Sequence, residues 1–189
     1  MPVLLGLHLF GLKGAFGKRI VGVMGALADV RDIDAMLKTL ATIDKRSQTI
    51  GQIFDADRIA GKKHLVHAAK LALTVQVTRM NFAESLNIEL VCWASGLRQI
   101  VRAFERVGVR KGCNRVAILT IGKSREDVKR AQTETLRELN LHRDDKVLDV
   151  NPKKISTLAK AFDISKKELG IAPIEELVLE KVALLSLQR

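Results

Sequence analysis

The order of apolar and polar residues divides the chain into short strands and amphipathic helices. Small and β-branched apolar residues dominate from Arg19 to Leu27 and from Thr49 to Phe54, which predicts two strands. Between them, apolar residues recur every three or four positions after Asp29, the spacing of an amphipathic helix with an aspartate at its N-cap. A longer helix is predicted from Lys62 to about Arg79.

Two further apolar runs are predicted to complete a sheet. The run Ile88–Trp93 is almost continuously apolar, which is typical of a central strand, and Arg115–Ile121 is predicted to be the fourth strand. Between these runs, a helix is predicted to begin at Ser95-Gly96. Its predicted apolar stripe consists of Leu97, Ile100, Val101 and Phe104. Three arginines, at positions 98, 102 and 106, recur along another side of the same helix.

Helical patterns dominate the C-terminal third. The predicted segments are Arg125–Leu139, Asn151–Phe162, a short capping box from Ser165 to Glu168, and Pro173–Leu187. The last helix has two apolar faces. At 100° per residue, Ile174, Val178 and Leu185 lie on one side, and Leu179, Ala183 and Leu187 lie on nearly the opposite side. One face can enter the core, and the other requires a cover, either the N-terminal segment or a separate chain.

The predicted fold class is α/β, or mixed α+β, in a single domain. Helices are predicted to cover a small mixed four-stranded sheet, and the C-terminal part is helical. Residues 18–189 form the predicted domain, and residues 1–17 are an N-terminal extension of unknown order. This glycine-punctuated extension has no basic leader and is too short to span a bilayer, so we expect a cytoplasmic protein with no membrane partner.

Charge favours an acidic partner. Lys and Arg number 32 against 21 acidic residues, giving a formal net charge of +11. This excess is compatible with nucleic acid, an anionic membrane surface or an acidic protein. The chain has no Tyr, one Trp and six Phe, which argues against an aromatic platform for stacking bases.

The turn from Phe54 to Leu65 carries the densest chemistry. Gly61 permits a positive φ and a close backbone approach, and Lys62, Lys63 and His64 place cations and N–H donors at a predicted helix N-terminus. Such a turn suits an anion, for example a nucleic-acid end. The alternative is an ordinary connection from strand to helix in which Asp57 is a cap and the lysines are solvated.

Enzymatic chemistry finds little support in the sequence. Ala117–Ser124 matches a loose phosphate-loop pattern that ends in Gly122-Lys123-Ser124, but its middle residues are β-branched or Leu and continue a strand. Asp55 and Asp57 lack an accompanying nucleophile. His64 and His67 lack a third metal ligand, Ser95 lacks the hydrolase elbow, and both cysteines are expected to be buried. We therefore predict no catalytic residue, metal, cofactor or small-molecule substrate.

Three segments carry a resemblance to a known family. They are FDADRIAGKKHLVHAAKLAL, LVCWASGLRQIVRAFERVGVRKGCNRVAILTIG and IEELVLEKVALL, in that order along the chain. Together they resemble the PRPK-binding protein family, the small kinase-binding subunit of the KEOPS (EKC) complex, which takes part in making threonylcarbamoyladenosine in tRNA. The resemblance runs from about Ile20 to Leu185.

The resemblance implies a non-catalytic subunit that binds the small atypical kinase of the complex, influences its activity and helps to recruit tRNA by its 3′ CCA end. The matching tRNA-binding positions are Arg58, Ala60, Gly61, Lys62, His64, Ser95, Gly96 and Arg98. The kinase would bind the second face of the last helix, at Leu179, Ala183 and Leu187. Two alternatives stay open: a nucleotide-binding enzyme that uses the Gly122-Lys123-Ser124 turn, and a protein-only adaptor without RNA binding.

Overall fold

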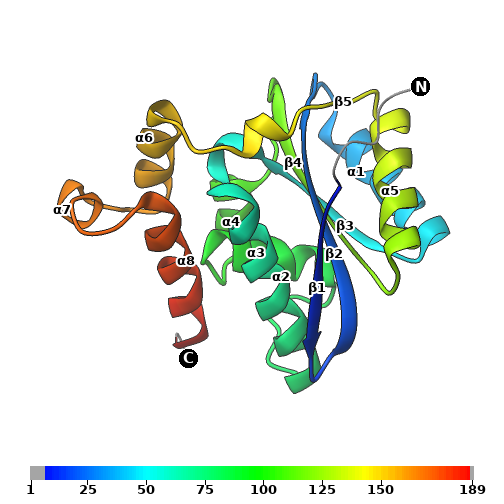
Figure 1. The fold of residues 1–189 in the computed structure, drawn as a ribbon, viewed down its shortest axis with the longest axis horizontal. Helices are drawn as coiled ribbons and strands as arrows, with labels where there is room; N and C mark the ends of the chain where they lie inside the picture. The colour runs from blue at the N-terminus through cyan, green and yellow to red at the C-terminus, as the bar shows by residue number, and fades with distance from the viewer. Residues whose placement is uncertain (1–6, 188–189) are drawn as a thin grey trace.

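An antiparallel sheet runs through the middle of the molecule in a computed structural model that describes residues 7–187 (Figure 1). Its strands are β1 (His8–Gly14), β2 (Gly17–Leu27), β3 (Ile50–Asp55), β4 (Arg115–Gly122) and the short β5 (His142–Arg143). The strand order is β1-β2-β4-β3, and β5 pairs with the end of β2. The predicted α+β class is confirmed, although all of these pairs are antiparallel and the sheet is not mixed.

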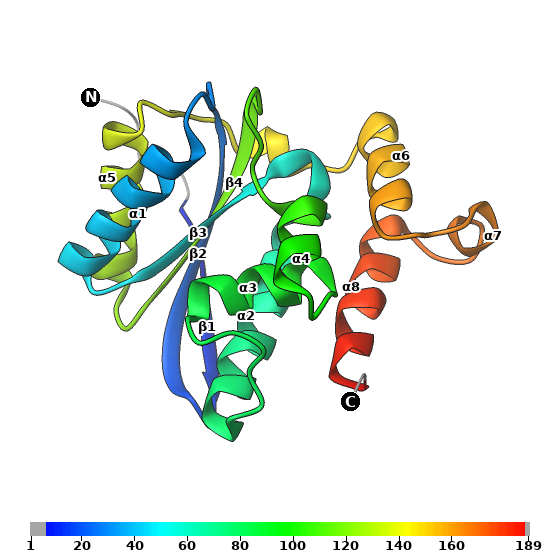
Figure 2. The ribbon, with the colours of Figure 1, turned by 180° about the vertical axis from the view of Figure 1, so that it is seen from behind.

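Helices cover both faces of the sheet. On one face lie α1 (Ile33–Ser47) and α5 (Arg125–Glu138). The other helices are α2 (Gly61–Thr78), α3 (Leu86–Ser95), α4 (Ile100–Val107), α6 (Pro152–Ala161), α7 (Lys166–Leu169) and α8 (Ile174–Leu184), with 3-10 turns η1 (Ala56–Arg58), η2 (Asp145–Leu148) and η3 (Leu185–Leu187). Figure 2 shows α1 and α5 on the side of the sheet opposite α2, α3, α4 and α8.

The alternation of side chains along β2 creates two apolar cores. Val21 and Val23 point into the larger core, which β2 shares with α2, α3 and α8. Met24 and Ala26 point the other way, into the smaller core under α1 and α5. Successive residues of a strand face opposite sides, so a strand buried on both faces needs apolar residues at nearly every position. This explains the unbroken apolar run that predicted β2.

Most predicted elements are present with small shifts. β2, β3 and β4 coincide with three of the predicted strands, and α2, α5, α6 and α8 coincide with predicted helices. The first helix begins later than predicted, at Ile33, because Asp32 and not Asp29 is its N-cap. The Asp32 carboxylate accepts a hydrogen bond from the Ala35 backbone N–H at 2.9 Å.

The predicted strand Ile88–Trp93 is wrong, because these residues belong to helix α3. Helix α3 packs against α2, α4, α8 and strand β3, so almost all of its side chains are buried and no polar face remains to reveal a helical period. The buried Glu89 carboxylate accepts hydrogen bonds from the Phe82 and Ala83 backbone N–H groups and from the Trp93 indole. A short apolar run of this kind does not distinguish a buried strand from a buried helix.

The predicted start of the next helix, at Ser95-Gly96, is also wrong. Gly96 instead ends α3 in the left-handed conformation, with a φ of 68°, and α4 begins only at Ile100. The buried side chains of α4 are Ala103 and Val107, whereas Val101, a member of the predicted stripe, is 71% exposed. Because α4 begins later than predicted, it buries a different side of the helix from the predicted apolar stripe.

Part of the predicted N-terminal extension belongs to the sheet. β1 pairs with β2 along its full length, from His8 opposite Val23 to Gly14 opposite Gly17. Phe10 and Leu12 pack against the larger core. Residues 1–6 lie outside the described part of the chain.

Candidate functional site

The turn between β3 and α2 is held by a buried carboxylate. Asp55 is 2% exposed, and its carboxylate accepts a hydrogen bond from the Asp57 backbone N–H at 3.0 Å. It also pairs with the Arg110 guanidinium at 2.6 Å, and Arg58 Nε lies 3.9 Å away. The turn then enters α2 at Gly61, whose φ of 80° favours glycine. These contacts fix the direction in which Arg58 leaves the backbone.

His64, a predicted RNA contact, is buried and joins two helices. The Ala60 backbone N–H donates to Nδ1 at 3.1 Å, so Nε2 carries the proton and donates to the Ala94 carbonyl at 2.8 Å. Burial lowers the pKa of His64 to about 4, so the ring is neutral at pH 7. With no exposed surface, this side chain positions α2 against α3 and is not available to a ligand.

Ser95 and Gly96, two further predicted RNA contacts, determine the path of the backbone after α3. The buried Ser95 hydroxyl donates to the Cys92 carbonyl at 2.8 Å and accepts from the Leu97 backbone N–H at 3.1 Å. A Cβ on Gly96 would lie 3.2 Å from the Lys181 carbonyl oxygen of α8. Both residues therefore shape the loop that precedes α4. Arg98 follows in this loop, and its guanidinium carbon lies 4.9 Å from the Phe82 ring centre.

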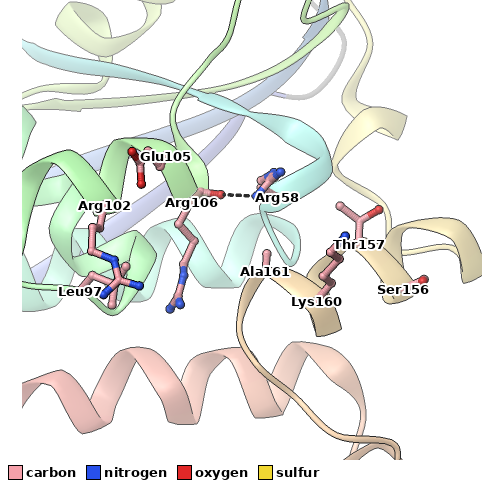
Figure 3. Close-up of a pocket in the computed structure, with 9 residues that line it drawn as sticks. All are labelled: Arg58, Leu97, Arg102, Glu105, Arg106, Ser156, Thr157, Lys160 and Ala161. Carbon is pink, nitrogen blue, oxygen red and sulfur yellow. Dashed lines mark hydrogen bonds between the residues drawn. The ribbon is translucent and has the colours of Figure 1, made fainter.

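A basic cleft opens between η1, α4 and α6 (Figure 3). It has a volume of about 430 Å³ and is lined by Arg58, Leu97, Arg102, Glu105, Arg106, Ser156, Thr157, Lys160 and Ala161. We call this set the basic cleft. Its walls carry four cationic side chains and one carboxylate, together with two hydroxyl groups. Such a lining suits a phosphate or another oxyanion.

Arg106 is the braced member of the basic cleft. Its guanidinium donates to the Ser95 carbonyl at 3.2 Å and to the Asp163 carboxylate at 3.0 Å. It also lies 5.4 Å from the Phe162 ring centre. Burial lowers the pKa of Arg106, and the Asp163 carboxylate opposes that shift. The Arg106 carbonyl in turn accepts a hydrogen bond from Arg58 at 3.3 Å, a contact visible in Figure 3.

The other cations of the basic cleft have more freedom. Arg102 is exposed, and among the described residues neither Arg102 nor Lys160 takes part in an ion pair. Figure 3 shows Lys160 reaching in from α6, across the cleft from the arginines of α4. Arg106 therefore offers donors in a fixed geometry, and Arg102 and Lys160 offer positive charge that an anionic ligand can neutralise.

The predicted RNA-binding residues do not form one surface. Arg58 lines the basic cleft, whereas Ala60, Gly61 and Lys62 line a separate groove of about 460 Å³ shared with Leu179 of α8. The Lys62 ammonium lies 2.9 Å from His8 Nε2 of β1. Arg98 borders a third, more apolar pocket between α2 and η3. The arginine ridge at 102 and 106 is part of the basic cleft.

Ser156, Thr157 and Lys160 were not predicted from the sequence. They lie about a hundred residues beyond Arg58 in the chain, and α6 brings them to the cleft by packing against η1. One signal was present, because Ser156 and Lys160 are four residues apart and share a helix face. That signal is weak, since exposed polar pairs at this spacing are common on helices.

The last helix has the two apolar faces that its sequence predicts. Ile174, Val178 and Leu185 are buried. On the opposite side, Leu179 and Ala183 are half-buried, and Leu187 is 74% exposed. We call Leu179, Ala183 and Leu187, the last of which lies in η3, the outer face of α8. In the described part of the chain this face is covered only in part: Leu179 lines the groove beside Gly61 and Lys62, and exposure is greatest at Leu187.

The geometry of the Gly122-Lys123-Ser124 turn differs from that of a phosphate loop. Residues 116–121 pair with β2 on one side and with β3 on the other, so their backbone groups belong to the sheet. Ser124 then caps α5 by accepting a hydrogen bond from the Asp127 backbone N–H at 3.1 Å. No group of three or more potential metal ligands occurs among the described residues.

Comparison with known proteins places these features in a family. Residues 27–186 match the model of the kinase binding protein CGI-121 family. The chain is also 32% identical, over 138 residues, to the regulatory protein Cgi121 of Methanocaldococcus jannaschii, an alignment that covers 73% of this chain and 84% of that protein. No helix in residues 7–187 is long and apolar enough to cross a bilayer. On the extent of both matches, the chain belongs to the kinase-binding CGI-121 family.

Proposed function

We propose that this protein is a non-catalytic, cytoplasmic subunit of a KEOPS complex, in which it binds the small atypical kinase and recruits tRNA by its 3′ CCA end. Membership of a kinase-binding family supports the first activity. The basic cleft is the observation that carries the second, because a single-stranded end presents closely spaced phosphates that Arg58, Arg102 and Lys160 can neutralise together.

For the tRNA end, the basic cleft replaces the wider set of residues suggested by the resemblance. Arg58 stays as a direct contact, and Arg102, Arg106 and Lys160 are added. His64, Ser95 and Gly96 support the cleft from behind because they fix α3 and the loop that leads to α4. With no aromatic side chain in the lining, base recognition falls to hydrogen bonds from Ser156 and Thr157 and to stacking on the arginine planes.

For the kinase, the outer face of α8 is the proposed docking surface. Leu179 and Ala183 lie on α8 and Leu187 follows in η3, and the exposed apolar area of Leu187 in particular is unfavourable in water. Glu176 and Glu180 are exposed on the same side of α8 as this stripe. A partner with an apolar strip bordered by basic residues would therefore match its chemistry.

Binding of matched tRNAs tests the RNA half of the proposal. Full-length tRNA and the same tRNA without its terminal CCA are titrated against the intact protein at several salt concentrations. We expect removal of CCA to weaken binding by about tenfold, roughly 1.4 kcal/mol, and the Arg102→Ala/Lys160→Ala variant to abolish this difference. The control Lys38→Ala removes an exposed cation of α1 and should retain it. Equal affinity of the unmodified protein for both RNAs would contradict recruitment of tRNA by its CCA end.

Binding to the purified kinase of the complex tests the protein half. Leu187→Asp places a charge on the most exposed position of the outer face, where it should not disturb folding, and we expect it to weaken kinase binding by at least about tenfold. Ile171→Asp is the matched control, because Ile171 is 79% exposed and precedes the helix. If Leu187→Asp bound the kinase with unchanged affinity, the kinase would have to bind a surface other than the outer face of α8.

A further inference from the structure

The face of β1 and β2 next to α5 carries a second concentration of positive charge. Lys13 and Lys18 are exposed and lie directly opposite each other on the two strands. Arg125 and Lys129 are exposed one turn apart on α5, and they border the same side of β1 beside Leu9. We call these four cations the hairpin surface. In both views the hairpin extends beyond the end of α5 (Figures 1 and 2).

The floor of the hairpin surface is open. Side chains at positions 9, 11, 13 and 18 share the α5 side of the two strands, because Leu9 pairs with Gly22 and Lys13 pairs with Lys18. A Cβ built on Gly11 would meet no atom within 4 Å. No helix of the described chain therefore covers this part of the sheet, and a ligand can approach the backbone closely.

The arrangement of the four cations is costly for the fold alone. Like charges directly opposite on neighbouring strands destabilise a sheet, and like charges four residues apart destabilise a helix. Lys13 opposite Lys18 is the first case, and Arg125 with Lys129 is the second. None of these four side chains forms an ion pair with a described residue. The two carboxylates in the first turn of α5 are Glu126 and Asp127, and Asp127 pairs with Arg130. A bound polyanion would relieve both repulsions.

We propose that the hairpin surface binds the phosphate backbone of double-stranded RNA without regard to sequence. In each pair the Cβ atoms are about 5 Å apart, and the long side chains let their cations reach neighbouring phosphates of a nucleic-acid backbone. The floor contains Leu9 and Gly11 and no aromatic ring, so it offers nothing on which an unpaired base could stack. This surface lies across the sheet from the basic cleft and does not depend on recognition of a CCA end.

The probe is a blunt RNA duplex of about 16 base pairs, which has no single-stranded end. Its affinity for the full chain is measured over a range of salt concentrations. We expect Lys13→Glu/Lys18→Glu to weaken binding by at least about tenfold and to reduce the slope of log K against log salt by about two. The control Lys166→Glu/Lys167→Glu changes the net charge equally at exposed positions of α7 and should alter affinity less than about twofold.

Three results would overturn the inference. Equal losses in the two variants would mean that net charge alone attracts RNA, and no loss in either would mean that duplex does not bind here. Loss of binding to a polyglutamate peptide, with duplex binding intact, would assign the surface to an acidic protein. None of these results bears on the basic cleft, because the cleft is tested by the difference between tRNAs with and without CCA.

Discussion

The basic cleft and the hairpin surface each carry four cations, but the cations are held in position to different degrees. In the cleft, Arg106 is fixed by a backbone carbonyl, a carboxylate and an aromatic ring, and its own carbonyl holds Arg58. On the hairpin, Lys13 and Lys18 extend into solvent from an edge of the sheet. Charge that is fixed in position can select one geometry, whereas mobile charge supplies affinity that any phosphate backbone satisfies. The two surfaces should therefore respond differently to mutation, pH and salt.

The largest expected difference concerns pH, because the support of the cleft contains a buried histidine. Unfolded His64 takes up a proton near pH 6.5, whereas its pKa in the folded protein is about 4. Between these values the unfolded chain binds more protons, so His64 makes stability fall as pH falls through this window. The full effect is about 3 kcal/mol and is complete near pH 4.

His64→Gln measures this contribution in chemical denaturation at several pH values. The variant is expected to be most destabilised relative to the unmodified protein at pH 7 and above, and this difference should shrink toward pH 4. His142→Gln, at an exposed position of β5, is the control for general loss of a histidine. A difference that does not change with pH would mean that His64 is not held neutral in the folded protein.

Removing the brace of the cleft comes next in size. Arg106→Ala loses the hydrogen bond to the Ser95 carbonyl and the contact with the Phe162 ring, and it leaves that carbonyl without its donor. We expect a loss of about 1 to 2 kcal/mol in the free energy of unfolding, together with loss of the preference for tRNA that carries CCA. Duplex affinity should change less than about twofold, because the hairpin surface does not contact α4. Arg106→Lys separates charge from geometry: retained CCA preference in this variant would contradict a requirement for the fixed guanidinium.

The sequence predicts those elements whose apolar pattern follows from their own burial, and it fails where tertiary packing decides the structure. β2 and β4 were predictable because a strand buried on both faces has apolar residues at almost every position. The same reasoning fails at Ile88–Trp93, where a helix enclosed by other helices and by β3 has an equally continuous apolar sequence. Only the buried Glu89, with its three hydrogen-bond donors, departs from that pattern, and its partners depend on the tertiary fold.

At the candidate site, the sequence located the region and not the surface. The resemblance makes His64 a ligand contact, but this residue is spaced four and eight residues from the buried Ala68 and Ala72, which places it on the apolar stripe of α2. That spacing could have indicated its burial. Lys160 could not have been assigned, because no local pattern shows that α6 returns to pack beside η1. Long-range packing creates the cleft, and local sequence supplies only its arginines.

Replacing one lysine of each surface by alanine tests the comparison through smaller changes in affinity. Lys160→Ala should reduce the ratio of affinities for tRNA with and without CCA by about three- to tenfold and leave duplex binding unchanged. Lys18→Ala should weaken binding to both tRNAs by the same factor and lower the salt slope by about one. Titrations of both variants at matched salt concentrations measure these quantities. If Lys18→Ala changed the ratio, the two surfaces would be one site.

The smallest effect is a gain in stability on the hairpin. Lys13→Thr removes the repulsion between directly opposed lysines and introduces a residue with a higher strand propensity, so the free energy of unfolding should rise by a few tenths of a kcal/mol. The same change should weaken duplex binding, since one phosphate contact is lost. Lys38→Thr in α1 is the control, because it removes an equal charge from an exposed helix without an opposed lysine. A more stable variant that binds RNA less tightly would show that this repulsion is maintained for binding, whereas a less stable variant would mean that the stem of Lys13 contributes packing that outweighs its charge.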